Sequence, residues 1–202
     1  MLFDPLPSGP FDLVLADPPW LHTGSKTKDQ AAGKHYECLS NEQLALLPVK
    51  TVMARKCVCL MWATGPLMHK AIELLGLWGF AYRGIEFVWV KTTKNGKIIE
   101  GQGVKPSIVK PTTEFIIAGS FQAKGRPLPL ATESMGQVVL APRPSLNGKP
   151  IHSAKPAIFR KKIEQLYPKV DRIELFAREN VPGWTPWGNQ AGSLNELTIT
   201  HR

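Results

Sequence analysis

Two patterns of apolar positions recur along this chain: short apolar or alternating runs, which are typical of strands, and apolar residues three or four positions apart, which are typical of helices. A run of the first kind lies near the N-terminus. Residues 13–16 form a short apolar run between polar neighbours, a pattern typical of a strand buried on both faces of a parallel sheet. Pro18 and Pro19 end this strand, because proline cannot donate the hydrogen bonds of a strand ladder. Asp17 is therefore expected at the carboxyl end of a buried strand, the edge at which open α/β sheets bind ligands.

Further strands and helices are predicted in alternation after this first strand. Strands are predicted at 57–63, 82–91, 113–120, 137–142 and 172–177, and helices at 42–47, 66–78 and 156–166. Ser40 and Gln43 form a capping-box pattern at the start of the first helix, and Pro66 suits the first turn of the second. The alternation predicts an α/β fold, with a mixed, mostly parallel sheet that is covered by helices on both faces.

The length and the apolar content bound the organisation of the chain. The 202 residues, 43% of them hydrophobic, fit one compact domain of roughly 100–250 residues. We therefore expect residues 1–202 to form a single domain, with a tail after residue 190 that is expected to be flexible. No run approaches the ~20 apolar residues of a membrane span, and the first residues lack the features of a signal peptide, so we expect a cytoplasmic protein.

The cysteines and histidines give no sign of a metal centre or a disulfide framework. Cys57 and Cys59 alternate within an apolar run, which is typical of buried strand thiols, and the third cysteine leaves an odd number. None of the five histidines stands at a zinc-ligand spacing from a cysteine. We therefore expect no structural metal.

The net charge of +9 indicates an anionic partner, and its distribution along the chain locates the contact. Residues 91–126 contain seven lysines and arginines against two glutamates, within a stretch rich in Gly, Pro, Ser and Thr. We expect an exposed basic loop at about 92–112 that binds nucleic acid. The candidate phosphate contacts are Lys94, Lys97, Lys105 and Lys110. The alternative is a solvated loop with no partner.

The sequence DPPW at 17–20 combines groups that can activate an exocyclic amine. The nitrogen of such an amine is a weak nucleophile, because its lone pair is delocalised into the ring. The Asp17 carboxylate and the rigid Pro18 carbonyl can each accept one N–H, which returns electron density to nitrogen and stabilises the charge that develops during transfer. Trp20 offers a flat surface for an extruded base. The alternative is an acid that caps a proline turn beside a core tryptophan.

Six segments resemble, in this order, the MT-A70 family, and together they cover nearly the whole chain. They are LADPPW, CLMWATGPLMHKAIELLGLWGF, FVWVKT, TTEFIIAG, HSAKP and IELFARENVPGWTPWGNQ. The resemblance implies a Rossmann-like fold with a permuted order of motifs and an adenine-N6 methyltransferase that uses S-adenosylmethionine and no metal. It implies that Asp17, Pro18, Pro19 and Trp20 are the catalytic residues.

The resemblance also implies a set of residues around the methyl donor. Lys155 of HSAKP matches a lysine near the methionine carboxylate of the donor, and Asn189 and Gln190 match positions that bind its adenosine. The remaining candidates are Asp17, Glu174, Phe176, Arg178 and Asn180. The segment ELFAR stands where many other methyltransferases carry a glycine-rich FxGxG. Alternatives are that Lys155 is a surface residue at a helix entry, that Glu174 is solvated, and that the tryptophans of GWTPWGN serve packing.

Adenine-N6 methylation of nucleic acid is the function that the resemblance implies, and DNA is the expected polymer. DNA is favoured because a short chain without an RNA-binding appendage resembles the bacterial and phage relatives. RNA is one alternative, and a catalytically silent nucleic-acid-binding subunit is another, although the intact Asp17 argues against it. Cytosine N4 and glutamine amides are further acceptors, but the resemblance associates them with a different residue at position 17. Besides nucleic acid, the expected partner is a second copy of this chain or a second subunit, and no membrane is expected.

Overall fold

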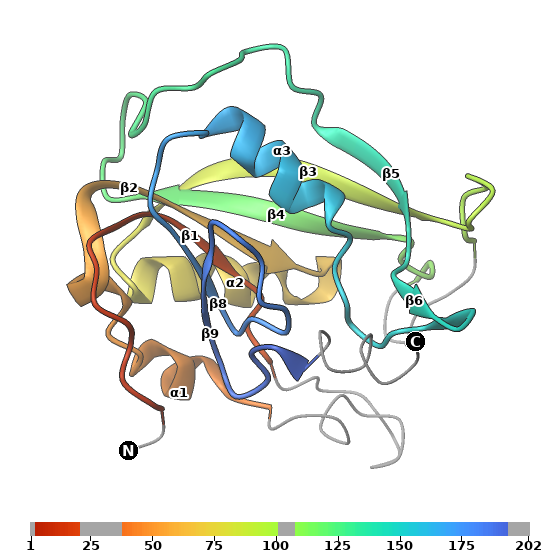
Figure 1. Cartoon of the computed structure of the whole chain (residues 1–202), viewed down its shortest axis with the longest axis horizontal. Coiled ribbons are helices and arrows are strands. Elements are labelled where there is room, and N and C mark those ends of the chain that lie inside the picture. Colours follow the sequence, from red (N-terminus) through yellow and green to blue (C-terminus); the bar gives the residue numbers. More distant parts are fainter. Residues whose placement is uncertain (1–2, 21–37, 101–107, 194–202) are drawn as a thin grey trace.

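A seven-stranded sheet forms the centre of the molecule in the computed structural model, which describes residues 3–20, 38–100 and 108–193 (Figure 1). The strand order is β5-β3-β4-β2-β1-β8-β9. The strands are β1 (Phe11–Ala16), β2 (Met53–Ala63), β3 (Ala81–Thr92), β4 (Thr113–Ser120), β5 (Val138–Pro142), β8 (Arg172–Leu175) and β9 (Thr185–Trp187). A separate small hairpin consists of β6 (Ser145–Leu146) and β7 (Lys149–Pro150).

Strand β4 runs against both of its neighbours, whereas the other neighbouring strands of the large sheet are parallel. The first residues of β4 therefore lie at the same edge as the last residues of the parallel strands. Because ligands bind at the carboxyl edge of such sheets, an antiparallel strand contributes its N-terminal residues to that edge.

Helices cover both faces of the sheet, as expected. The helices α1 (Asn41–Ala45) and α2 (Met68–Leu77) pack on one face, and α3 (Ile158–Leu166) packs on the other, in front of the sheet in Figure 1. Each face has its own hydrophobic core. Along β1, Val14 and Ala16 belong to the core beneath α1 and α2, and Leu13 and Leu15 belong to the core beneath α3. All four side chains are buried, so β1 is buried on both faces, as its apolar run predicts.

The Rossmann-like α/β fold is confirmed, and the differences from the expected elements are local. The capping box at Ser40 and Gln43 is present, and the helix expected at 66–78 begins as a 3₁₀ turn at Gly65–Leu67. Strand β9 and the β6–β7 hairpin were not expected. Both are short and owe their strand geometry to a neighbouring strand rather than to an apolar run of their own.

The segment expected to be a basic loop, about 92–112, lies between the end of β3 at Thr92 and the start of β4 at Thr113. Lys91 lies within β3. The connection between these two strands includes residues 101–107, which lie outside the described residues.

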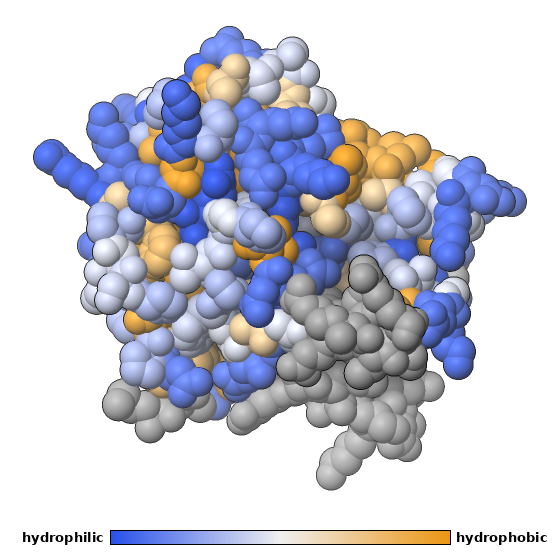
Figure 2. Space-filling model, viewed as in Figure 1, coloured by the Kyte–Doolittle hydropathy of each residue, from blue (hydrophilic) through white to orange (hydrophobic). Residues whose placement is uncertain are grey.

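The surface over α3 is mostly hydrophilic (Figure 2). The helix buries Phe159 and Ile163 against the sheet, and its Lys161 and Gln165 are exposed. Of the helices that the structure describes, none has the length and apolar character that crossing a membrane requires.

Candidate active site

A cavity of about 360 Å³ lies at the carboxyl edge of the sheet. Its walls come from the segments that follow β1, β2, β8 and β9, from the start of β4 and from the loop before α3. The lining includes Asp17, Pro18, Pro19, Trp20, Trp62, Glu114, Ser153, Lys155, Phe176, Arg178, Trp187, Asn189 and Gln190. This volume lies within the range of roughly 300–1,000 Å³ that is usual for small-molecule sites.

Asp17 stands at the end of β1, where its backbone N–H donates to the Leu175 carbonyl of the neighbouring strand at 3.4 Å. Its side chain is 29% exposed, and its Oδ2 accepts a hydrogen bond from Lys155 Nζ at 2.7 Å. Burial raises the pKa of Asp17 above its usual value, and the Lys155 ammonium opposes that rise. The carboxylate is thus partly buried and is held in a hydrogen bond with the Lys155 ammonium.

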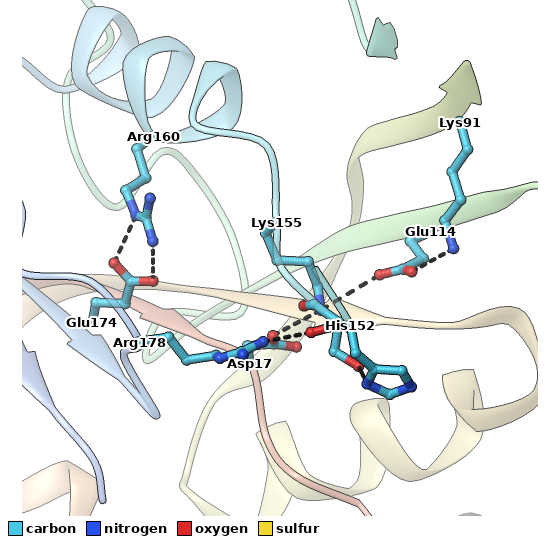
Figure 3. A network of polar contacts seen from close by, with 9 residues as sticks. Asp17, Lys91, Glu114, His152, Lys155, Arg160, Glu174 and Arg178 are labelled. Atoms are coloured by element: carbon cyan, nitrogen blue, oxygen red, sulfur yellow. Dashed lines mark hydrogen bonds and ion pairs between the residues drawn. The ribbon is translucent and has the colours of Figure 1, made fainter. Parts of the chain in front are cut away.

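Four side chains of alternating charge form a chain of contacts that ends at Asp17 (Figure 3). They are, in order, Lys91, Glu114, Lys155 and Asp17. Lys155 Nζ lies 3.6 Å from Glu114 Oε2, and Lys91 Nζ lies 2.6 Å from Glu114 Oε1. Burial would raise the pKa of Glu114, but Lys155 and Lys91 together hold it below its usual value. Sequence reasoning missed Glu114, because a glutamate near the start of a strand carries no local signal of a site.

Lys155 has further contacts at the wall of the cavity. Its ammonium donates to the Ser153 carbonyl at 3.1 Å and lies 5.4 Å from the centre of the Trp62 ring. The adjacent His152 carbonyl accepts from Arg178 Nη1 at 2.6 Å, so two cations hold consecutive carbonyls of the same loop. The side chain of Lys155 is 15% exposed, which does not fit a surface lysine at a helix entry.

Trp20 belongs to the cavity wall and to the core at once. Its ring is 6% exposed, and its indole Nε1 donates to Asn41 Oδ1 at 2.9 Å. Asn41 in turn donates to Lys70 O at 2.9 Å and to Glu73 Oε2 at 2.7 Å on α2. The DPPW corner is therefore tied to both helices of that face. Sequence reasoning missed Asn41, whose partners are distant in the chain.

The far wall of the cavity contains most of the residues expected around the donor. Phe176 has a φ of 61°, and its ring meets the Trp187 ring edge-on at 5.6 Å. A Cβ at Gly188 would stand 2.8 Å from Phe176 Cα, so the two chain segments need glycine there to approach this closely. Arg178, Asn189 and Gln190 line the same wall, and the buried Arg178 Nε has no hydrogen-bond partner among the described residues.

Glu174 does not line the cavity, whereas Phe176 and Arg178 of the same segment do. Ile173 and Leu175 belong to the core beneath α2, so Glu174 faces α3 on the other side of the sheet. There it accepts two hydrogen bonds from Arg160, at 2.7 and 2.9 Å (Figure 3). Glu179 accepts a further one from Arg160 at 2.6 Å. Glu174 is thus neither solvated nor placed at the expected donor site, and Asn180 is also absent from the lining.

The candidate nucleic-acid residues are exposed where the structure describes them. Lys94 and Lys97 lie in the turn that follows β3, where Thr93 N donates to Lys97 O at 2.8 Å, and Lys110 lies shortly before β4. Lys105 lies outside the described residues. Within the described ranges, no group of three or more His, Cys, Asp or Glu side chains is arranged to hold a metal ion.

Comparisons with known proteins match the MT-A70 family model to residues 11–190. The type II methyltransferase M.MunI of Mycoplasma sp is 31% identical, and the match covers 93% of this chain and 80% of that protein. The human N(6)-adenine-specific methyltransferase METTL4 is 29% identical over 89% of this chain, and the human N(6)-adenosine-methyltransferase catalytic subunit METTL3 is 31% identical over 94% of it. The chain spans 37% and 30% of the lengths of these two human proteins.

Proposed function

The chain belongs to the MT-A70 family of adenine-N6 methyltransferases, and on this premise we propose that it methylates adenine N6 in nucleic acid, with DNA as the preferred polymer. The observation that carries the proposal is the position of Asp17. Its carboxylate lies at the wall of a cavity of ligand size, next to the Pro18 carbonyl. That carbonyl accepts one hydrogen bond from Trp20 N at 2.9 Å, and its second lone pair is available for another donor.

The two acceptors suit the two N–H groups of the adenine amine. When Asp17 and the Pro18 carbonyl each accept one N–H, the nitrogen lone pair is withdrawn from the ring and directed at an electrophile. Asp17 then stabilises the positive charge that develops on N6 during transfer. The reaction is a direct attack and forms no covalent bond to the enzyme.

The residues of the far wall fit S-adenosylmethionine, which supplies an electrophilic methyl group on a sulfonium. Lys155 would pair with the carboxylate of the donor, and Asn189 and Gln190 would hold its adenosine. The buried Arg178 Nε is a donor that still requires an acceptor, which supports a polar ligand at this wall. Phe176 supplies apolar surface beside it. Glu174, which Arg160 holds on the other face of the sheet, is not proposed as a direct contact, and the role of Asn180 near the ribose of the donor stays a prediction.

DNA is preferred over RNA because of the similarity to M.MunI, 80% of whose length this chain covers. It is named a type II methyltransferase, a term used for enzymes that modify DNA. RNA is the second candidate, since the similarity to METTL3, named an adenosine methyltransferase, extends over 94% of this chain. METTL3 is also named a catalytic subunit, which supports the proposal of a homodimer or a second subunit here. Cytoplasmic localisation stays a prediction.

The proposal is tested by supplying tritiated S-adenosylmethionine with DNA, RNA and protein in parallel. We expect incorporation into DNA, recovered as N6-methyladenine after digestion, and none with Asp17→Asn. Incorporation into RNA alone would replace DNA by the second candidate. A protein that binds donor and DNA but methylates no substrate would be a silent subunit, and the proposal would be wrong.

A further inference from the structure

We propose that Glu114 is a positioning residue for methyl transfer: anchored by Lys91, it draws Lys155 away from Asp17 and keeps the Asp17 carboxylate available to the adenine amine. Because Asp17 acts here as the acceptor of that amine, the role of Glu114 rests on the proposed function. Nothing in the DPPW motif itself points to this residue, which comes from a different strand.

Lys155 and the adenine amine compete for the Asp17 carboxylate, and Glu114 offers Lys155 another anion. Lys155 Nζ is 2.7 Å from Asp17 Oδ2, so the ammonium occupies one of the acceptor sites that an adenine N–H needs. Separating a lysine from its carboxylate in a partly buried site is costly unless a second anion takes over. Glu114 Oε2 is 3.6 Å from the same ammonium, within reach of a small rotation of the lysine side chain.

The two oxygens of Glu114 have separate partners, which makes its position firm. Oε1 accepts from Lys91 Nζ at 2.6 Å, whereas Oε2 faces Lys155. The Glu114 side chain is 13% exposed and begins in β4, where Glu114 pairs with Trp89 of β3. Glu114 is therefore an anchored anion, and Figure 3 shows Lys155 in contact with both Glu114 and Asp17. In this proposal Lys155 turns from Asp17 toward Glu114, on the side from which it also pairs with the donor.

The pKa of Asp17 reports where Lys155 resides. Among the described residues, the charged groups that face Asp17 are Lys155, Glu114 and Arg178, with Glu174 behind β8. Neutralising Glu114 removes a nearby negative charge and takes from Lys155 one of its two carboxylate contacts. The pKa of Asp17 should then fall. Neutralising Lys91 leaves Glu114 free to pull harder on Lys155, so the pKa of Asp17 should rise.

The experiment compares Glu114→Gln and Lys91→Met with the wild-type protein in two measurements. The first is the pH titration of the Asp17 carboxyl carbon by ¹³C NMR, with Asp17→Asn to assign the signal. The second is the acid limb of kcat/KM for methyl transfer, which reports the ionisation of the essential carboxylate in the free enzyme. Glu133→Gln and Arg126→Met are the matched controls, since they neutralise an exposed ion pair with the same N–O distance of 2.6 Å.

We expect Glu114→Gln to move the Asp17 titration and the acid limb to lower pH and to reduce kcat/KM by about tenfold to 10²-fold. Lys91→Met should move both to higher pH, and the two controls should move neither. Folded variants that lose activity while the Asp17 titration stays in place would overturn the role of Glu114. Should Glu114→Gln fail to fold, the upward shift in Lys91→Met decides the matter alone. If the Asp17 titration shifts in the predicted directions but the protein methylates no substrate, the contact between Glu114 and Lys155 is supported and the proposed function is wrong.

Discussion

Asp17 and Lys155 stand 138 positions apart in the sequence, and their side chains are joined by a hydrogen bond of 2.7 Å. The contact links the segment after the first strand of the sheet to the loop before α3. It makes the state of the Asp17 carboxylate depend on residues from the second half of the chain, where most of the proposed donor contacts also lie.

Replacing Asp17 by Asn should abolish methyl transfer without weakening the fold. The amine loses its anionic acceptor, and the loss of one such group costs ~10²–10³ in rate or more. Burial raises the pKa of Asp17, so the folded protein holds this proton more tightly than the unfolded chain. The ionised carboxylate therefore opposes folding increasingly as the pH rises through that range, and the neutral amide does not. Turnover and thermal melts at neutral pH check both points.

The matched control for this substitution is Asp171→Asn, at the exposed start of β8 and the opposite edge of the sheet. It should leave turnover unchanged. An Asp17→Asn enzyme with near-normal activity on every substrate would sink the mechanism.

Replacing Trp20 by Phe should lower the free energy of unfolding by about 1–3 kcal/mol. The buried Asn41 Oδ1 would lose its indole donor, and an unsatisfied buried acceptor costs about that much. Some methyl transfer should remain, because an aromatic ring still lines the cavity. Chemical denaturation measures the change, with Tyr82→Phe on the exposed part of β3 as a control without effect. A Trp20→Phe protein of wild-type stability that no longer engages nucleic acid would make the ring a base platform only.

Replacing Lys94, Lys97 and Lys105 together by Ala should weaken DNA binding uniformly across sequences. Each lost phosphate contact should flatten the plot of log K against log salt by ~0.9 on duplex DNA. Donor affinity, measured by calorimetry, should not change. The control removes the same number of charges at Arg55, Lys56 and Lys169, which are exposed near the amino ends of β2 and β8. An unchanged slope in the loop variant would place the nucleic-acid groove elsewhere, on this chain or on a partner.

Replacing Glu174 by Gln should reduce stability by about 1–3 kcal/mol, because the buried Arg160 loses its two-point charged partner and keeps only Glu179. The affinity for S-adenosylmethionine should stay the same, since Glu174 faces α3. The double variant Arg160→Met/Glu174→Leu should recover much of the stability, as apolar side chains can replace a buried ion pair at little cost. A fall in donor affinity at unchanged stability would restore Glu174 to the donor site.

Sequence reasoning reached the elements of the fold and the DPPW corner because their signals are local. The apolar run before Asp17 and the two prolines after it place a carboxylate at a strand end without reference to any distant residue. The capping box at Ser40 is equally local, and the structure reproduces it.

What sequence reasoning missed depends on which strands become neighbours. Glu114 reaches the site because β4 is inserted antiparallel between β2 and β3, and no pattern within 113–120 states that direction. Asn41 acquires its role from Trp20 and α2, both remote in the chain. For Glu174, the alternation along β8 separates it from Ile173 and Leu175, but the sequence does not tell which face of the sheet borders the cavity.

The central position of β1 has a consequence for the synthesis of the protein. This strand precedes the others in the chain, yet it pairs on one side with β2 and on the other with β8, which ends at Leu175. A nascent chain growing from its N-terminus therefore carries a buried-type strand with one open edge until β8 has left the ribosome, and such an edge invites misassociation. Lys155, the hydrogen-bond partner of Asp17, is also synthesised late, shortly before β8. A newly made molecule therefore acquires its site only after Lys155 and β8 have been synthesised, long after the DPPW motif.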